Sequence, residues 1–149
     1  GLGDVYKRQV MKFRRRYDVP VEITIPDELM LIPMDAILIE QVIVNLLENS
    51  VLHGKTTTLI KLTLSSDGEN AVFSVADNGS GINEKKLPML FSGYFIHAEE
   101  QSGDVKRNMG IGLSVCLTII KAHGGTMTAG NLPEGGAEFT FTLPLERAL

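Results

Sequence analysis

Cysteine is nearly absent from this sequence, and tryptophan is absent altogether. The single cysteine, Cys116, excludes an internal disulfide and a cysteine-rich metal site. There is also no apolar run long enough to span a bilayer and no signal-peptide pattern at the start. Positive charge is in deficit, since the formal net charge is −4. We therefore expect no nucleic-acid partner and no direct membrane contact from this domain.

The length and the apolar content predict one compact domain. The chain has 149 residues, of which 44% are hydrophobic, and no repeat or Pro/Ser-rich linker interrupts it. The opening "GLGDVYKRQ", residues 1–9, lacks the periodicity of a strand or a helix, and we interpret it as a remnant of expression or processing. The domain is then expected to occupy residues 10–149.

Apolar periodicity predicts the elements of this domain. Alternating patterns predict strands at 21–26, 29–32, 58–65, 70–77, 125–130 and 137–145. Continuous apolar patterns predict helices at 35–54, with Asp35 as N-cap and Gly54 after its end, and at about 111–123. Strands and helices intermix without a strict βαβ alternation. This favours an α+β sandwich, a mixed sheet with helices on one face.

The first predicted helix carries a polar strip on an otherwise apolar surface. Gln41, Asn45 and Asn49 are four residues apart and lie on nearly the same face. A buried carboxamide without partners costs about 1–3 kcal/mol, so the strip must meet polar groups. Either it forms an internal hydrogen-bond network, or it lines a pocket in which an asparagine oxygen binds Mg²⁺. The helix by itself does not decide between the two.

A second motif, "SVADNGSGI", ends a predicted strand. Asp77 is followed by Gly79 and Gly81, which let the backbone turn sharply and let a flat ligand approach it. The Asp77 carboxylate could accept a hydrogen bond from an exocyclic amine such as that of adenine. The alternative is a β-hairpin, because Asn-Gly is a strong turn signal.

A third motif, "NMGIGLSVC", opens the second predicted helix. Gly110 and Gly112 are expected just before this helix, where free N–H groups can meet phosphate oxygens. Lys106 and Arg107 precede them in a polar loop that could close over a polyphosphate or could simply be solvated surface. A dinucleotide-binding fingerprint is excluded, because its third glycine would fall at Val115. The segment "HGKTT" ends like a P-loop but follows a helix and lacks the earlier glycine.

The order of these motifs closely resembles the ATP-binding domain of sensor histidine kinases, in the superfamily that includes gyrase, Hsp90 and MutL. "EQVIVNLLENS" resembles the N box, "DNGSGI" the G1 box, "LPMLFSGYF" the F box and "GIGLSVC" the G2 box. The likeness covers residues 20–145. Within the family, the sequence is most similar to the Kdp-type, potassium-responsive kinases. The resemblance implies the Bergerat fold, a two-layer α/β sandwich with about five strands, about three helices on one face and a flexible ATP lid.

The resemblance also implies a site for ATP and Mg²⁺. Its residues would come from the four motifs and the lid: Asn45, Asn49, Asp77, Gly79, Gly81, Ile82, Phe91, Tyr94, Lys106, Arg107, Gly110, Gly112 and Leu113. Asn49 would hold the Mg²⁺, and Asp77 would recognise the adenine amino group. Gly110, Gly112 and Leu113 would form a hinge at the phosphates. Lys106 or Arg107 would reach the terminal phosphates, and Asn45 would act at the reaction centre.

Asn45 favours a kinase over an ATPase. The resemblance implies that the related ATPases have a glutamate at this position, whereas the amide of Asn45 cannot act as a strong base. A neutral imidazole needs no such base to attack a phosphoryl group. Three positions depart from the family pattern, namely Leu52, Ile96 and Asn108, and they raise the alternative of a nucleotide-binding regulatory module without transfer activity.

The phosphoacceptor is expected outside this chain. None of His53, His97 and His123 lies in an "H-E-x-x-T-P" context. The resemblance implies a histidine-bearing dimerisation domain in the same protein, a response regulator as downstream acceptor, and a cytoplasmic location in a membrane-anchored bacterial inner-membrane sensor. We expect the fragment to bind ATP but not to phosphorylate itself.

Overall fold

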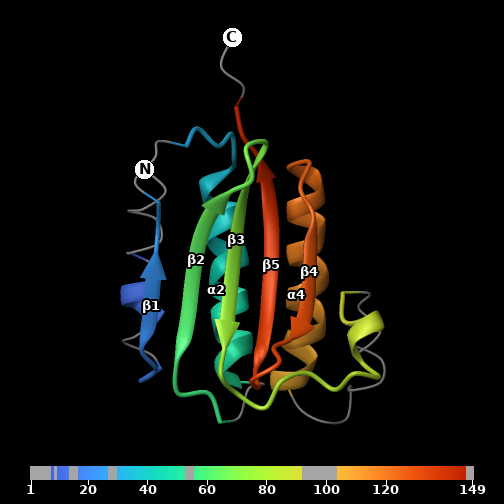
Figure 1. Cartoon of the computed structure of the whole chain (residues 1–149). Helices are drawn as coiled ribbons and strands as arrows, with labels where there is room; N and C mark the ends of the chain where they lie inside the picture. The colour runs from blue at the N-terminus through green and yellow to red at the C-terminus, as the bar shows by residue number, and fades with distance from the viewer. Residues whose placement is uncertain are drawn as a thin grey trace.

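The strands form one sheet, and the helices lie on one side of it (Figure 1). The computed structural model describes residue 8 and residues 10–13, 17–26, 30–52, 56–91 and 104–146, with the backbone alone at residues 52 and 104–111. The elements are β1 (Val21–Thr24), α2 (Ala36–Leu52), β2 (Ile60–Ser66), β3 (Asn70–Asp77), the 3-10 helix η1 (Leu87–Met89), α4 (Asp104–Ala122), β4 (Met127–Asn131) and β5 (Ala137–Pro144). Residues 10–13 are helical as well.

The sheet is mixed, as predicted. Its order is β1-β2-β3-β5-β4, with β1 parallel to β2 and every other pair antiparallel. Figure 1 shows α2 and α4 side by side on one face of the sheet. The α+β sandwich expected from the element order is therefore confirmed. One helical layer on one sheet face requires each strand to bury alternate side chains, and β3 and β5 do so along their whole length.

Local signals in the sequence determine several boundaries. Asp35 caps α2, since its Oδ1 accepts hydrogen bonds from the backbone N–H groups of Ile37 and Leu38 at 3.1 and 3.2 Å. The turn between β2 and β3 uses Gly68, whose φ of +96° lies in the left-handed region. The strand expected at 29–32 is wrong, because residues 30–32 form no strand. The carbonyl of Leu31 instead accepts a single hydrogen bond, 2.8 Å long, from the N–H of Glu146.

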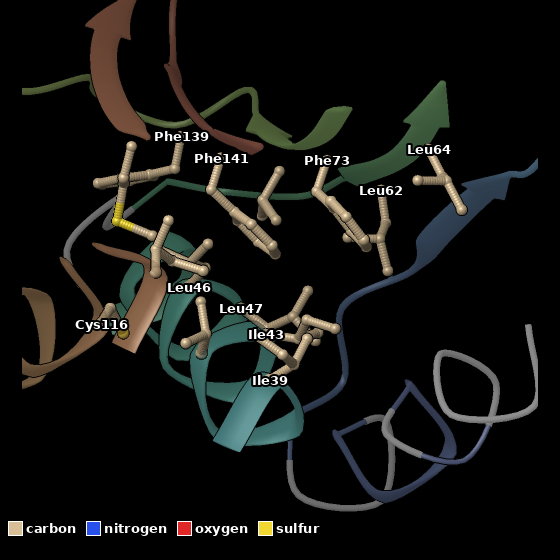
Figure 2. Packing of buried hydrophobic residues seen from close by; sticks show 14 of the residues in the cluster. Ile39, Ile43, Leu46, Leu47, Leu62, Leu64, Phe73, Cys116, Phe139 and Phe141 are labelled. Carbon is tan, nitrogen blue, oxygen red and sulfur yellow. The ribbon is translucent and has the colours of Figure 1, made fainter. Parts of the chain in front are cut away.

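The core lies between the sheet and α2. Figure 2 shows Ile43, Leu46 and Leu47 of α2 facing Phe73 and Phe141 of the sheet. The rings of Phe73 and Phe141 stack with centroids 4.5 Å apart. These five side chains are at most 1% exposed, and burying each one fully stabilises the fold by about 1.5–3 kcal/mol. This packing fixes α2 on the sheet and so determines which of its faces is left for a ligand.

The two long helices run antiparallel, which brings three predicted motifs to one end of the domain. His123, just after α4, joins the helices at the other end. Its Nε2 accepts a hydrogen bond from the N–H of Asp35 at 3.0 Å, and its Nδ1 lies 2.8 Å from the carbonyl oxygen of Ile119. His123 is therefore a residue that closes the end of a helix. Figure 1 shows the last turn of α2, the end of β3 and the start of α4 at the same end of the sandwich.

Candidate functional site

The three carboxamides on α2 differ in burial along the strip. Gln41 is exposed, Asn45 is half-buried, and Asn49 is 8% exposed. The Nδ2 atom of Asn49 is the only buried side-chain nitrogen or oxygen without a hydrogen-bond partner in the part of the chain that the structure describes. An unpaired buried amide group costs about 1–3 kcal/mol. An internal hydrogen-bond network therefore does not account for Asn49, and its amide is available to a ligand.

Asn45 contacts the second helix. Its Nδ2 donates a hydrogen bond to Sγ of Cys116 at 3.5 Å. A Cβ added at Gly112 would lie 3.7 Å from Cγ of Asn45, which is ordinary van der Waals contact, so α4 packs against the amide at this position. Burial raises the pKa of the Cys116 thiol from 9.0 to about 11, although the hydrogen bond from Asn45 lowers it in part. At neutral pH the sulfur is thus an uncharged, weak acceptor that directs the amide nitrogen of Asn45 toward α4.

Asp77 is the last residue of β3, and one of its carboxylate oxygens accepts two hydrogen bonds. The residue is 5% exposed. Its Oδ1 accepts hydrogen bonds from the backbone N–H of Gly79 at 2.9 Å and of Ala137 at 3.3 Å. These two donors hold the carboxylate plane, so Oδ2 is the atom left to face a ligand. The hairpin alternative is wrong, because residues 78–91 form no strand and β3 pairs with β2 and β5.

The loop after Asp77 needs glycine at one position and is held by a distant asparagine. Gly81 has a φ of +80°, and a Cβ there would lie 2.9 Å from Oδ1 of Asn131. That same oxygen accepts the N–H of Ile82 at 2.7 Å, and Nδ2 of Asn131 donates to the carbonyl of Ile82 at 2.8 Å. Ile82 is half-buried against the core. Asn131 was not among the predicted site residues, since nothing local in the sequence links two positions 49 residues apart.

The start of α4 corrects one expectation. This helix begins at Asp104 rather than near residue 111, so Gly110 and Gly112 lie inside it and not at its N-terminus. Their backbone N–H groups are therefore not the free donors expected for phosphate. Gly112 instead packs against Asn45 from within the helix. Leu113, expected in a hinge, is fully buried at 0% exposure and belongs to the core.

The structure describes some of the other predicted residues fully, some by their backbone alone and some not at all. Phe91 is half-buried and packs against the core. Tyr94 and Ile96 lie outside the described residues, as do His53 and His97. The backbone at Lys106, Arg107 and Asn108 is helical, and the backbone at Leu52 ends α2, but their side chains are outside the described set.

The described residues do not form a metal site by themselves. Among the described residues there is no group of three or more His, Cys, Asp or Glu side chains that could hold a metal ion. A cation here would need further ligands from a bound molecule or from water.

None of the helices in the described ranges is long and apolar enough to cross a membrane.

The sequence and the fold both match known proteins. Residues 34–147 match the family described as "Histidine kinase-, DNA gyrase B-, and HSP90-like ATPase". The sensor protein KdpD of Clostridium acetobutylicum is 36% identical over 126 residues, which cover 85% of this chain and 14% of KdpD. The ATP-binding domain of PrrB from Mycobacterium tuberculosis superposes with a TM-score of 0.76 at 26% identity, over 97% of this chain and 93% of that one.

A third match is a full-length protein in complex with AMPPNP. Full-length ShkA in complex with AMPPNP has a TM-score of 0.79 at 25% identity, over 99% of this chain and 31% of ShkA. The chain belongs to the histidine kinase-, DNA gyrase B- and HSP90-like ATPase family. The predicted likeness to sensor histidine kinases, and to the Kdp type among them, is confirmed. The chain spans 14% of the length of its KdpD relative.

Proposed function

We propose that this domain binds ATP with Mg²⁺ and presents the γ-phosphoryl group to a histidine on a separate dimerisation domain of a longer protein. The observation that carries the proposal is the buried amide nitrogen of Asn49 without a partner, because such a group calls for a polar ligand. The family match and the AMPPNP complex of the similar kinase ShkA support a nucleotide as that ligand.

The base would bind at the end of β3. Oδ1 of Asp77 is engaged by two backbone N–H groups, which leaves Oδ2 to accept a hydrogen bond from the adenine amino group. Gly79 and Gly81 would leave room for the ring, and the half-buried Ile82 would contact it. Phe91, also half-buried, and Tyr94 would complete the aromatic part of the site.

The metal would bind at Asn49. A hard cation takes oxygen ligands, so Oδ1 of Asn49 would bind Mg²⁺, and the unpaired Nδ2 could then donate to a phosphate oxygen. Mg²⁺ usually keeps several water and phosphate ligands and needs few from the protein, which fits a site with a single buried amide. When bound, Mg²⁺ would neutralise charge on the phosphates. Lys106 or Arg107 would add positive charge from the lid.

Asn45 would position the reacting groups and would not activate water. Its amide nitrogen is directed toward Cys116, and an amide is too weak a base to take a proton from water. A neutral histidine ring nitrogen can attack the γ-phosphorus directly, with ADP as the leaving group. Catalysis then consists of positioning and charge neutralisation, as in phosphoryl transfer generally.

The partners follow from this reaction. The acceptor histidine would belong to a dimerisation domain of the same protein, and a response regulator would then take the phosphoryl group. The domain would lie in the cytoplasm, attached to a bacterial inner-membrane sensor. Residues 10–149 would form this domain, with residues 1–9 outside it.

Labelling with γ-labelled ATP tests the proposal. The chain alone should bind the nucleotide and remain unlabelled. When the dimerisation domain of its own parent protein is added, that domain should become labelled, and Asn49→Leu should remove the labelling. Gln41→Leu, an exposed carboxamide on the same helix, is the matched control and should label normally. Covalent labelling of the chain itself would contradict the proposal. Nucleotide binding without any transfer would favour the regulatory alternative.

A further inference from the structure

The last residue of β4 is tied to a loop far away in the sequence. The carboxamide of Asn131 makes two reciprocal hydrogen bonds with the backbone of Ile82, accepting from its N–H at 2.7 Å and donating to its carbonyl at 2.8 Å. The preceding residue, Gly81, has a φ of +80°, which favours glycine, and a Cβ there would lie 2.9 Å from Oδ1 of Asn131 and would make this oxygen shift. The carboxamide and the left-handed Gly81 therefore form one matched arrangement.

The same end of the β4–β5 hairpin also holds the other end of that loop. Ala137 pairs with Asn131 in the sheet register, and its N–H donates to Oδ1 of Asp77 at 3.3 Å. Gly136 passes so near the backbone of Asp77 that an added Cβ would lie 1.9 Å from its carbonyl oxygen. The hairpin end at residues 131–137 thus contacts both Asp77 and Ile82, the two ends of the loop that carries the glycines.

We propose that Asn131 is a positioning residue for the adenine half of the nucleotide site. It holds the Ile82 end of the loop at a fixed distance from the Asp77 carboxylate, and this sets the clearance over Gly81 for a flat base. The inference rests on the proposed function, because it takes Asp77 to be the residue that recognises the base. It extends that function by assigning base recognition to the β4–β5 hairpin as well as to the loop itself.

The domain should stay folded when both hydrogen bonds of Asn131 are removed. Both involve solvent-exposed groups, so water can replace the side chain without leaving a buried group unsatisfied. The loop would then lose its fixed position, while the sheet would stay intact. A similar tie exists at the other end of the same hairpin, where Oγ1 of Thr142 accepts the N–H of Thr126 at 3.0 Å. That tie lies away from the loop and supplies a control.

Calorimetric titration of the 149-residue chain tests this assignment with three probes, each with Mg²⁺: AMPPNP, its guanine counterpart GMPPNP, and inorganic triphosphate. Asn131→Leu removes both hydrogen bonds and keeps a side chain that branches at Cγ. Asn131→Asp keeps the acceptor but sets a second oxygen against the carbonyl of Ile82. Both variants should bind AMPPNP about tenfold more weakly and discriminate less between AMPPNP and GMPPNP, with triphosphate affinity unchanged. Thr142→Val should behave like the wild type with all three probes.

Three results would overturn the assignment. If Asn131→Leu or a folded Asn131→Asp keeps wild-type AMPPNP affinity and base preference, Asn131 does not position the base. If triphosphate binding weakens as much as AMPPNP binding, the effect is general and not on the base. If the wild-type chain binds no AMPPNP at all, the proposed function fails and this inference fails with it, so the two failures are distinguishable.

Discussion

Replacing Asp77 by asparagine should change which base the domain prefers. The two backbone donors at Gly79 and Ala137 hold Oδ1, so the asparagine oxygen should take that position and the new amide nitrogen should take the position of Oδ2. A donor would then face the adenine amino group, which is itself a donor. The loss of a hydrogen bond to a charged acceptor is worth about 1.5–3 kcal/mol, or roughly 10- to 150-fold in affinity.

The same geometry predicts a partial rescue. Hypoxanthine carries a carbonyl oxygen where adenine carries its amino group, so an inosine triphosphate analogue offers the acceptor that the new amide requires. Asp77→Asn should therefore lose adenine affinity and gain relative affinity for the hypoxanthine analogue. Titration calorimetry with both analogues in the presence of Mg²⁺ measures the two affinities. The melting temperature checks the fold, and it should shift little, because the variant still accepts the two N–H groups.

Asp77→Ala supplies the contrast. It leaves the buried N–H of Ala137 without its acceptor, and an orphaned buried donor costs about 1–3 kcal/mol of stability. This variant should be destabilised and should show no preference for hypoxanthine. The reasoning is refuted if Asp77→Asn retains full adenine affinity, or if it weakens both analogues by the same factor.

Three further predictions concern stability and reactivity. Asn49→Leu removes the unpaired buried amide and should leave the ligand-free domain as stable as the wild type or up to about 1–3 kcal/mol more stable; a lower denaturant midpoint would contradict this. Burial raises the pKa of the Cys116 thiol, so the folded state favours the protonated sulfur. About 2–3 kcal/mol of stability should therefore be present below pH 9 and lost as the pH rises toward 11. Cys116→Ala should abolish this loss, and a native thiol that reacts rapidly with iodoacetamide at pH 7 would contradict the prediction. Gly136→Ala should destabilise the fold far more than Gly135→Ala. Both glycines have a positive φ, which costs about 1–3 kcal/mol for alanine, but only at Gly136 would the Cβ collide with Asp77. Equal melting temperatures of the two variants would contradict this prediction.

The sequence predicts well those features that depend on neighbouring residues. The bounds of β3 at Asn70–Asp77 and the capping of α2 by Asp35 agree with the structure. Alternation and capping are determined within a few residues, so they can be recognised without knowledge of the fold. The same applies to the order of the four family motifs, which was sufficient to identify the fold.

The predicted start of α4 was wrong, because two glycines argued against a helix that in fact includes them. A glycine inside a helix costs about 1 kcal/mol relative to alanine, so local propensity argued for a helix that begins only after Gly110 and Gly112. In the structure the helix continues through both of them. There Gly112 packs against Asn45, at a distance where an added Cβ would make ordinary van der Waals contact. Such a contact joins residues 67 positions apart and has no local signal.

Asn131 and Cys116 were missed as site residues for the same reason. Cys116 entered the sequence argument only as the absence of a disulfide, yet it is the hydrogen-bond acceptor for Asn45. Asn131 lies just after the strand predicted at 125–130 with no motif around it, and its partner Ile82 belongs to another motif. Residues that hold a site in place are found only when the strands are assembled. Asn49 and Asp77, which we propose to face the ligand, belong by contrast to the recognisable motifs.

The central claim is that Asn49 couples Mg²⁺ to nucleotide binding, and a titration with AMPPNP with and without Mg²⁺ tests it most directly. The wild-type chain and the control Gln41→Leu should bind AMPPNP more tightly when Mg²⁺ is present. Asn49→Leu should remain folded, should still bind adenosine at the Asp77 end, and should lose the effect of Mg²⁺. An AMPPNP affinity of the wild type that does not depend on Mg²⁺, or a full Mg²⁺ effect in Asn49→Leu, would contradict the account.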